Sequence, residues 1–168
     1  MAFQVNPFIS TGIPSNSKIE IGPFQKIGDG YYYIESNDAT NWYEAYEKCR
    51  RLDADLITFE TVAEWDAIVK YLNDRGDKRE YWTSGNDLAN KGKHNWFTNA
   101  KPIDINKWAG GQPDNDKGRE HCIHLGYVYK TSTKYELNDR PCSNQDNNSR
   151  FRYICEKPQP ISASFILW

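Results

Sequence analysis

The chain has 168 residues, a formal net charge of −2 and 14% aromatic residues. The near balance of 21 basic and 23 acidic residues excludes the broad positive field with which proteins bind nucleic acid or anionic membrane surfaces. No stretch approaches the roughly 20 consecutive apolar residues of a membrane-spanning helix. We therefore expect one globular domain with no nucleic-acid partner and no membrane span.

The two ends of the chain differ from its middle. Residues 1–23 are polar and lack any helical or strand period, so we expect an N-terminal extension. The main domain is predicted to span residues 24–157, and residues 158–168 form an apolar tail. Residues 1–18 contain no basic region followed by an apolar run of signal-peptide length, and we interpret the chain as a mature form with an added start methionine.

Four short segments are predicted as strands. Near the start of the main domain, the run from Tyr31 to Ile34 is aromatic and follows the turn sequence Gly28-Asp29-Gly30. The next short strand is predicted from Leu56 to Phe59. Two later strands are predicted from Cys122 to Leu125, with His124 on the polar face, and from Tyr153 to Cys155.

Two amphipathic helices are predicted in the first half of the domain. Asn41 can cap the first helix, with Glu44 three residues later, and Thr61 with Glu64 forms a capping box for the second. Gly76 is a typical stop for the second helix. Helical spacing predicts that Trp42, Ala45, Tyr46 and Cys49 are buried in the first, and Trp65, Ile68, Val69 and Leu72 in the second.

Four cysteines can pair in three ways, and their arrangement leaves the pairing open. They are Cys49, Cys122, Cys142 and Cys155, and no CxxC sequence suggests a zinc knuckle. Two disulfides in an oxidising compartment are the preferred interpretation, because small secreted domains use such bridges. Four free thiols in a cytosolic protein are the alternative. We expect a secreted, extracellular protein.

The stretch from residue 112 to residue 139 concentrates oxygen-bearing side chains around Cys122 and Cys142. Three carboxylates and two amides suit a hard divalent cation that takes several oxygens at once, above all calcium. Each short motif taken separately is also typical of a surface turn, but together they indicate a calcium site. The five candidate metal ligands are Gln112, Asp114, Glu120, Asn138 and Asp139.

The order Gln112-Pro113-Asp114, Glu120-x-Cys122 and Asn138-Asp139-x-x-Cys142, after two predicted helices, resembles the C-type lectin-like domain over about residues 28–157. The chain is similar in particular to small secreted galactose-binding invertebrate C-type lectins. The resemblance implies an α+β fold with two helices packed on small antiparallel sheets, a long calcium-binding loop and two disulfides. It also implies that Cys49 pairs with Cys155 and Cys122 with Cys142.

The resemblance implies that one calcium ion is held by the amide oxygens of Gln112 and Asn138 and the carboxylates of Asp114, Glu120 and Asp139. A cis peptide bond before the intervening proline is part of this pattern. The same five residues would hydrogen-bond two adjacent sugar hydroxyls that complete the calcium shell. In the family, the order Gln-Pro-Asp accompanies a preference for galactose or N-acetylgalactosamine. Glycan recognition or agglutination in innate immunity, by several copies or a homo-oligomer, is the role that this resemblance suggests.

Many galactose-binding members carry a tryptophan after Gln-Pro-Asp, but residues 115–119 of this chain contain none. Four aromatic residues from elsewhere are considered either as replacements that stack on the sugar or as ordinary packing residues: Trp108, Tyr127, Tyr129 and Tyr135. A second calcium site, found in some members, is not expected. Asp87 matches one of its acids, but Lys91 and His121 stand where further carboxylates are needed.

Two other functions are considered. Glu120, His121 and His124 could suggest a zinc hydrolase, but the two histidines are expected on opposite faces of a strand, and no nucleophile elbow, P-loop or HExxH occurs. We therefore expect no enzyme activity. A domain of the same fold that binds a protein partner is the open alternative. Asn147 is a candidate glycosylation site, and residues 165–168 are either an interface or an ordinary end.

Overall fold

The computed structural model describes residues 22–127, 133–143 and 149–158. The regular elements within these ranges alternate between strands and helices in the first half and are strands and one short 3₁₀ helix in the second. They are β1 (Gln25–Ile27), β2 (Gly30–Thr40), α1 (Trp42–Arg51), β3 (Asp55–Leu56), α2 (Val62–Asp74), β4 (Tyr81–Asn86), β5 (Asn95–Trp96), η1 (Asp116–Gly118), β6 (Cys122–Tyr127), β7 (Tyr135–Arg140) and β8 (Phe151–Glu156).

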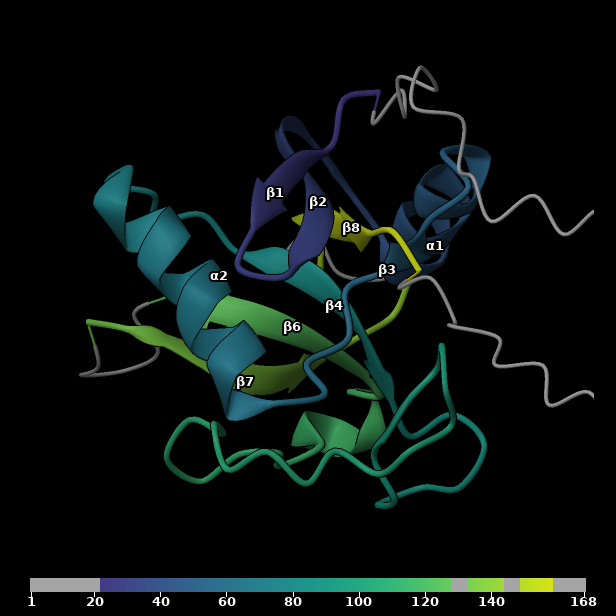
Figure 1. Ribbon diagram of the computed structural model, residues 1–168. Coiled ribbons are helices and arrows are strands. Elements are labelled where there is room, and N and C mark those ends of the chain that lie inside the picture. Colours follow the sequence, from purple (N-terminus) through teal and green to yellow (C-terminus); the bar gives the residue numbers. More distant parts are fainter. Residues whose placement is uncertain (1–21, 128–132, 144–148, 159–168) are drawn as a thin grey trace, which may run out of the picture.

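The strands form one mixed sheet, in which β1, β2, β8, β4, β6 and β7 lie side by side in this order (Figure 1). β3 pairs with β8, and β5 pairs with β4. The resemblance implies small antiparallel sheets within the C-type lectin-like fold, and the described strands join into one mixed sheet instead. β8 lies between β2 and β4, antiparallel to β2 and parallel to β4. This last strand therefore connects β1 and β2 with β4, β6 and β7.

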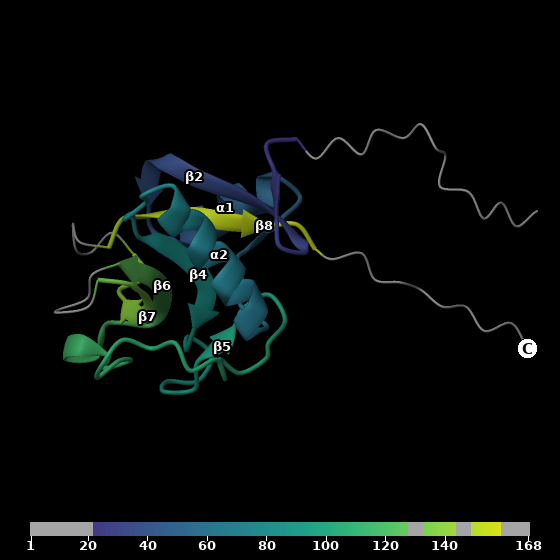
Figure 2. The same cartoon turned by 60° about the vertical axis from the view of Figure 1, so that its left-hand side comes forward.

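The two helices are separated by the sheet and pack against different buried clusters. In Figures 1 and 2, α1 and α2 lie apart with strands between them. Neighbouring residues of a strand point to opposite faces, and accordingly Tyr81 and Trp82 of β4 belong to different clusters. The cluster of α2 includes Trp65, Ile68, Leu72, Ile123 and Ile154, and the cluster of α1 includes Trp42, Ala45, Cys49, Cys122 and Cys155.

Both helices begin as the sequence predicts. The Asn41 side chain accepts a hydrogen bond from the Glu44 backbone N–H, and the Thr61 side chain accepts one from the Glu64 N–H. α2 ends at Asp74, and Gly76 follows with φ of 65°, a backbone conformation that a residue without Cβ adopts at little cost. The capping predictions are confirmed.

The second half contains more strand than the sequence predicts. Neither β4 nor β7 is among the four strands predicted from the sequence. β7 contains several charged and amide residues, so its sequence does not have the apolar pattern by which a strand is predicted. It nevertheless pairs with β6 along six residues. The prediction of a polar face at His124 is wrong, because His124 is 1% exposed and packs near Trp82 and Phe151.

One disulfide connects a helix to the sheet, and a second connects β6 to the segment after β7. Cys49 of α1 pairs with Cys155 of β8, and Cys122 at the start of β6 pairs with Cys142 after β7, the pairing that the resemblance implies. In the part of the chain that the structure describes, none of the helices has the length and apolar character needed to cross a membrane. Residues 1–21, Tyr129, Asn147 and residues 165–168 lie outside the described residues.

Candidate functional site

The candidate ligands come from two places that the sheet brings together. Gln112, Asp114 and Glu120 lie in the long connection between β5 and β6, which runs below the sheet in Figure 1. Asn138 and Asp139 lie in β7, at one edge of the sheet. β7 pairs with β6, the strand that begins two residues after Glu120, so the two groups of ligands meet.

Three carboxylates converge at this meeting point. One oxygen each of Asp114, Glu120 and Asp139 can be chosen so that all three lie within 4.8 Å of one another. Among the described residues, this is the one group of three such side chains that could hold a metal ion. Asp139 and Glu120 are 0% and 7% exposed, whereas Asp114 is exposed, so the group is open to solvent on one side. We call these three residues the loop carboxylate cluster.

Backbone hydrogen bonds hold the loop against β7. The Asp139 carboxylate accepts hydrogen bonds from the backbone N–H groups of Asp114 (3.1 Å) and Asn115 (2.7 Å). The Asp114 N–H also lies 3.1 Å from Oε1 of Gln112, and the bond between Gln112 and Pro113 is cis. The cis bond agrees with the pattern that the resemblance implies. These contacts place Gln112 and Asp114 next to Asp139.

Glu120 is fixed by a turn of unusual backbone conformation. Asn115 has φ of 47°, in the left-handed region that asparagine tolerates, and its side chain accepts a hydrogen bond from the Glu120 N–H at 3.1 Å. Glu120 Oε2 accepts a bond from the Asp116 N–H at 3.2 Å. Nη1 of Arg140 lies 3.6 Å from Glu120 Oε1. Groups of the same loop therefore fix the position of Glu120 and of its carboxylate.

The electrostatics of the cluster favour an added positive charge. The pKa of Glu120 is raised to about 7, chiefly because burial disfavours its charged form and further because the Asp139 and Asp114 carboxylates lie nearby. The Asp116 N–H and the Arg140 guanidinium act in the opposite direction. A cation shared by the three carboxylates would stabilise the charged form of Glu120.

Asn138 provides a separate test of whether the residues fit calcium. The side chain is 2% exposed, and its Oδ1 finds no hydrogen-bond partner among the described residues. A buried acceptor without a partner costs free energy. Coordination of a cation would satisfy it, and Asn138 is next to Asp139 of the cluster. The donor set of carboxylate and amide oxygens, without thiolate or imidazole, fits calcium.

Comparison with known proteins identifies the family. A sequence model described as "Lectin C-type domain" matches residues 38–157. The chain belongs to the C-type lectin family. It is 52% identical to C-type lectin 37Da of Drosophila melanogaster over 160 residues, which cover 95% of this chain and 85% of that protein. It is 32% identical to salivary C-type lectin 1 of Aedes albopictus over 125 residues, which cover 72% and 78% of the two chains.

A solved structure shows the same fold at lower sequence identity. The carbohydrate-recognition domain of the mouse scavenger receptor C-type lectin superposes with a TM-score of 0.64 at 23% identity, over 84% of this chain and 98% of that one. The C-type lectin fold, with its two helices and two disulfides, is thereby confirmed. The C-type lectin domain is a non-enzymatic binding domain, as predicted.

The aromatic residues considered for sugar stacking are engaged in packing in this C-type lectin. Trp108 is partly buried and meets the His94 ring edge-on at 5.5 Å. Tyr127 and Tyr135 pack against each other at 4.9 Å, and Tyr135 is 3% exposed. The three rings therefore contribute to packing within the domain. Tyr129 lies outside the described residues.

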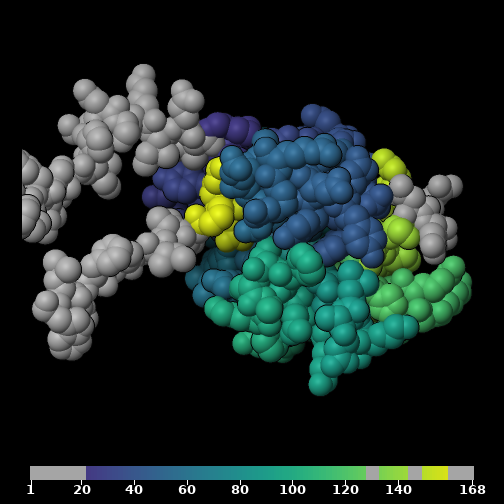
Figure 3. All heavy atoms as spheres, turned by 90° about the vertical axis from the view of Figure 1, so that its right-hand side faces the viewer, coloured from purple at the N-terminus to yellow at the C-terminus, as the bar shows by residue number. Residues whose placement is uncertain are grey.

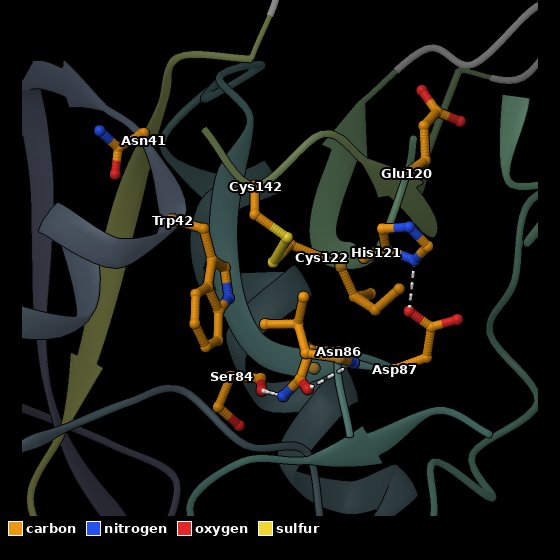
Figure 4. The surroundings of a disulfide bond; sticks show 12 residues. Asn41, Trp42, Ser84, Asn86, Asp87, Glu120, His121, Cys122 and Cys142 are labelled. Carbon is orange, nitrogen blue, oxygen red and sulfur yellow. Dashed lines mark hydrogen bonds and ion pairs between the residues drawn. A yellow bond between two sulfur atoms is a disulfide. The ribbon is translucent and has the colours of Figure 1, made fainter. Parts of the chain in front are cut away.

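Asp87, which matches an acid of the second calcium site, has partners from the protein itself. Its Oδ1 lies 2.8 Å from His121 Nδ1 (Figure 4). Its Oδ2 accepts a hydrogen bond from the Gly92 N–H at 2.7 Å. Oδ2 also lies 3.8 Å from His94 Nε2. His124 is buried in the interior, whereas His121 faces Asp87, so the two histidines do not form a joint site.

Two residues near the cluster were missed from the sequence. Arg140 lies beside Glu120, and the side chain of Asn115 supports the Glu120 backbone. Arg140 directly follows the candidate ligand Asp139 in the sequence. A single arginine next to a candidate ligand does not by itself indicate a role in the site. Asn115 lies in a loop whose conformation the sequence alone did not define.

Proposed function

We propose that this protein is a secreted, calcium-dependent lectin that binds galactose-type glycans through one calcium ion. The ligands are Gln112, Asp114, Glu120, Asn138 and Asp139. The observation that carries the proposal is the convergence of three carboxylate oxygens within 4.8 Å, next to a buried amide oxygen that has no partner among the described residues.

Each ligand residue has a defined task. The carboxylates of Asp114, Glu120 and Asp139 supply the charge that offsets a divalent cation, and the amides of Gln112 and Asn138 supply neutral oxygens. Calcium takes six to eight oxygens, so positions remain at which it can bind two sugar hydroxyls. The carboxylates accept hydrogen bonds from these hydroxyls, and the amide N–H groups donate to them. Asp114 is exposed and therefore reachable by a glycan.

Two observations support the finer parts of the proposal. The Gln112-Pro113-Asp114 order places an amide before a carboxylate, the order associated with galactose and N-acetylgalactosamine in the family that the chain resembles. Two disulfides and a salivary relative are consistent with secretion into an oxidising compartment, where the protein recognises glycans on cell or microbial surfaces. Since a single sugar site is weak, several copies act together on a surface.

Affinity chromatography tests the proposal directly. The protein is applied to galactose-agarose and mannose-agarose with millimolar calcium and eluted with a chelator. We expect retention on galactose-agarose and release by the chelator. Retention that ignores the chelator would contradict calcium bridging, and preferential retention on mannose-agarose would contradict the galactose assignment. A glycan array without any calcium-dependent signal would favour a protein partner.

A further inference from the structure

A hollow of about 300 Å³ lies at the C-terminal end of α2. None of its described lining residues belongs to the loop carboxylate cluster. In Figure 1, α2 starts near the long loop and ends at the upper left, away from that loop. Figure 3 views the molecule from the right-hand side of Figure 1, where α1 (blue) and the long loop (teal to green) lie. The lining residues that matter below are Ser36, Tyr71, Arg75, Asp77 and Arg79.

Arg75 is held at the hollow by the last turn of α2. Its guanidinium carbon lies 5.3 Å from the centre of the Tyr71 ring, and its Nη1 donates to the Tyr71 hydroxyl at 3.0 Å. That hydroxyl donates to Oε1 of Gln25 at 2.6 Å, so the tyrosine is fixed as well. Among the described residues, this is the one hydrogen bond of the Arg75 guanidinium. Most of its five N–H donors are therefore available to a ligand.

Asp77 holds a second arginine, Arg79, at the same hollow. The Asp77 carboxylate accepts hydrogen bonds from the Arg79 backbone N–H at 2.8 Å and from Arg79 Nη1 at 3.1 Å. It also accepts one from the Tyr81 hydroxyl at 2.7 Å. The Asp77 side chain is 7% exposed and that of Arg79 is 45% exposed, so the arginine is the more accessible of the two. Asp77 is the only acid among the described lining residues, and these three donors offset its charge.

A third arginine reaches this lining from β8. Residues two apart on a strand share a face, so Arg152 lies on the same face as Ile154, which belongs to the cluster of α2. Arg152 Nε donates to the carbonyl of Ser36 at 2.6 Å, and Ser36 lines the hollow. Three guanidinium groups from different parts of the chain therefore gather here. An anion bound among them would offset their mutual repulsion.

We propose that this hollow binds the sulfate or phosphate ester of an acidic glycan, without calcium. Guanidinium groups donate paired N–H bonds to the oxygens of such an ester, and these charge-assisted bonds are the strong ones. The volume of the hollow is at the lower end of the roughly 300 to 1,000 Å³ of small-molecule sites, which suits one esterified sugar ring. The inference goes beyond the proposed function, because it requires neither calcium nor any of the five proposed calcium ligands.

NMR titration of the disulfide-intact protein in a chelator tests this site, because the chelator keeps calcium from the loop carboxylate cluster. The probes are galactose 6-sulfate, galactose 6-phosphate and, as the uncharged match, galactose. We expect at least one ester to bind with a dissociation constant of about 1 mM or tighter. It should shift the side-chain Nε–H signals of Arg75 and Arg79, and galactose should not. The ester that binds more tightly identifies the source of the anion.

Two variants of Arg75 test whether the hollow itself binds the ester. Arg75→Gln should weaken binding about tenfold, because it removes charge-assisted hydrogen bonds. Arg75→Lys keeps the charge but loses the planar fork of donors, so we expect it to weaken binding by about threefold. Backbone amide spectra should show that both variants keep the fold.

Arg51→Gln is the matched control, because Arg51 is the last residue of α1, its side chain is 72% exposed and it does not line the hollow. It removes the same charge at the end of the other helix, and the variant should bind the ester as the wild-type protein does. The site is refuted if neither ester binds, if galactose binds equally tightly, or if Arg75→Gln weakens binding no more than Arg51→Gln. Since every titration contains the chelator, these outcomes are independent of whether the proposed calcium site binds galactose.

Discussion

Two groups of acidic residues in this domain differ in how their oxygens are arranged. The loop carboxylate cluster brings three oxygens within 4.8 Å of one another. The second group, which we call the hairpin carboxylate group, consists of Glu60, Glu64 and Glu156 beside a hollow of about 360 Å³ near the β1–β2 turn. Its members do not converge in this way among the described residues.

The hairpin carboxylates are satisfied by the protein itself. Tyr32 donates its hydroxyl to Glu64 at 2.7 Å, the Thr58 N–H donates to Glu156 at 3.1 Å, and Lys101 lies 3.3 Å from Glu60. In the loop cluster, the neighbouring Asn138 oxygen has no such donor among the described residues. A concentration of acids therefore does not by itself indicate a metal site. Convergent oxygens and an acceptor without a donor distinguish the loop cluster.

Removal of one loop carboxylate should give the largest effect. We expect Asp114→Ala to weaken calcium binding by at least about 100-fold, because even residues behind metal ligands contribute 10- to 100-fold. Retention on galactose-agarose should disappear, and both disulfides should remain. Titration with calcium and a thiol assay measure these outcomes.

Two control variants sharpen this comparison. Asp116→Ala removes a nearby exposed carboxylate that is outside the loop cluster, and Glu64→Gln alters the hairpin group. Both should bind calcium with wild-type affinity to within about threefold. Equal losses from Asp114→Ala and Asp116→Ala would show that calcium binding reflects general negative charge and not the convergent oxygens.

Calcium affinity should also depend on pH. The pKa of Glu120 in the calcium-free protein is about 7, so below pH 7 calcium must displace a proton from this carboxyl. Between pH 8 and pH 6 we expect affinity to fall by about tenfold. Calorimetry in two buffers of different ionisation enthalpy should detect proton release near pH 6 and almost none at pH 8. Affinity that is unchanged over this range would contradict a role for Glu120 as a ligand.

Local patterns explain what the sequence predicted well. The helix starts at Asn41 and Thr61 depend on side chains within three residues of each other, and the five candidate ligands stand in short motifs. By contrast, the strand character of β7 depends on its pairing with β6, since its own sequence is polar. The parallel contact of β8 with β4 and the burial of His124 likewise depend on segments distant in the chain. The roles of the five ligands remain proposals that the experiments above test.

Arg140 should moderate the calcium affinity of the loop cluster. Its guanidinium lies 3.6 Å from the Glu120 carboxylate and repels a divalent cation held by the same group. Its side chain is 32% exposed, so solvent screens part of this repulsion. We expect Arg140→Gln to tighten calcium binding by about three- to tenfold in titrations at pH 9. This higher pH is needed because loss of the guanidinium also raises the pKa of Glu120 and increases proton competition at lower pH. Arg75→Gln, outside the site, should have no effect, and weaker calcium binding by Arg140→Gln would refute the repulsion.

The smallest effect is expected from the hairpin carboxylate group, and it concerns stability alone. Burial and the nearby Glu64 carboxylate raise the pKa of Glu156 to about 8. The folded protein therefore binds a proton that the unfolded chain releases near pH 4.5, and this contribution to stability is lost as the pH rises toward 8. Glu156→Gln should stabilise the calcium-free protein at pH 8.5 by about 1 kcal/mol, or roughly 2 to 4 °C in thermal unfolding, and do little at pH 4.5.

Glu47→Gln, exposed on α1, should show no such difference between the two pH values. Equal effects of Glu156→Gln at both pH values would mean that the carboxyl charge is not the cause, and a change in its calcium affinity would contradict the separation of the two groups.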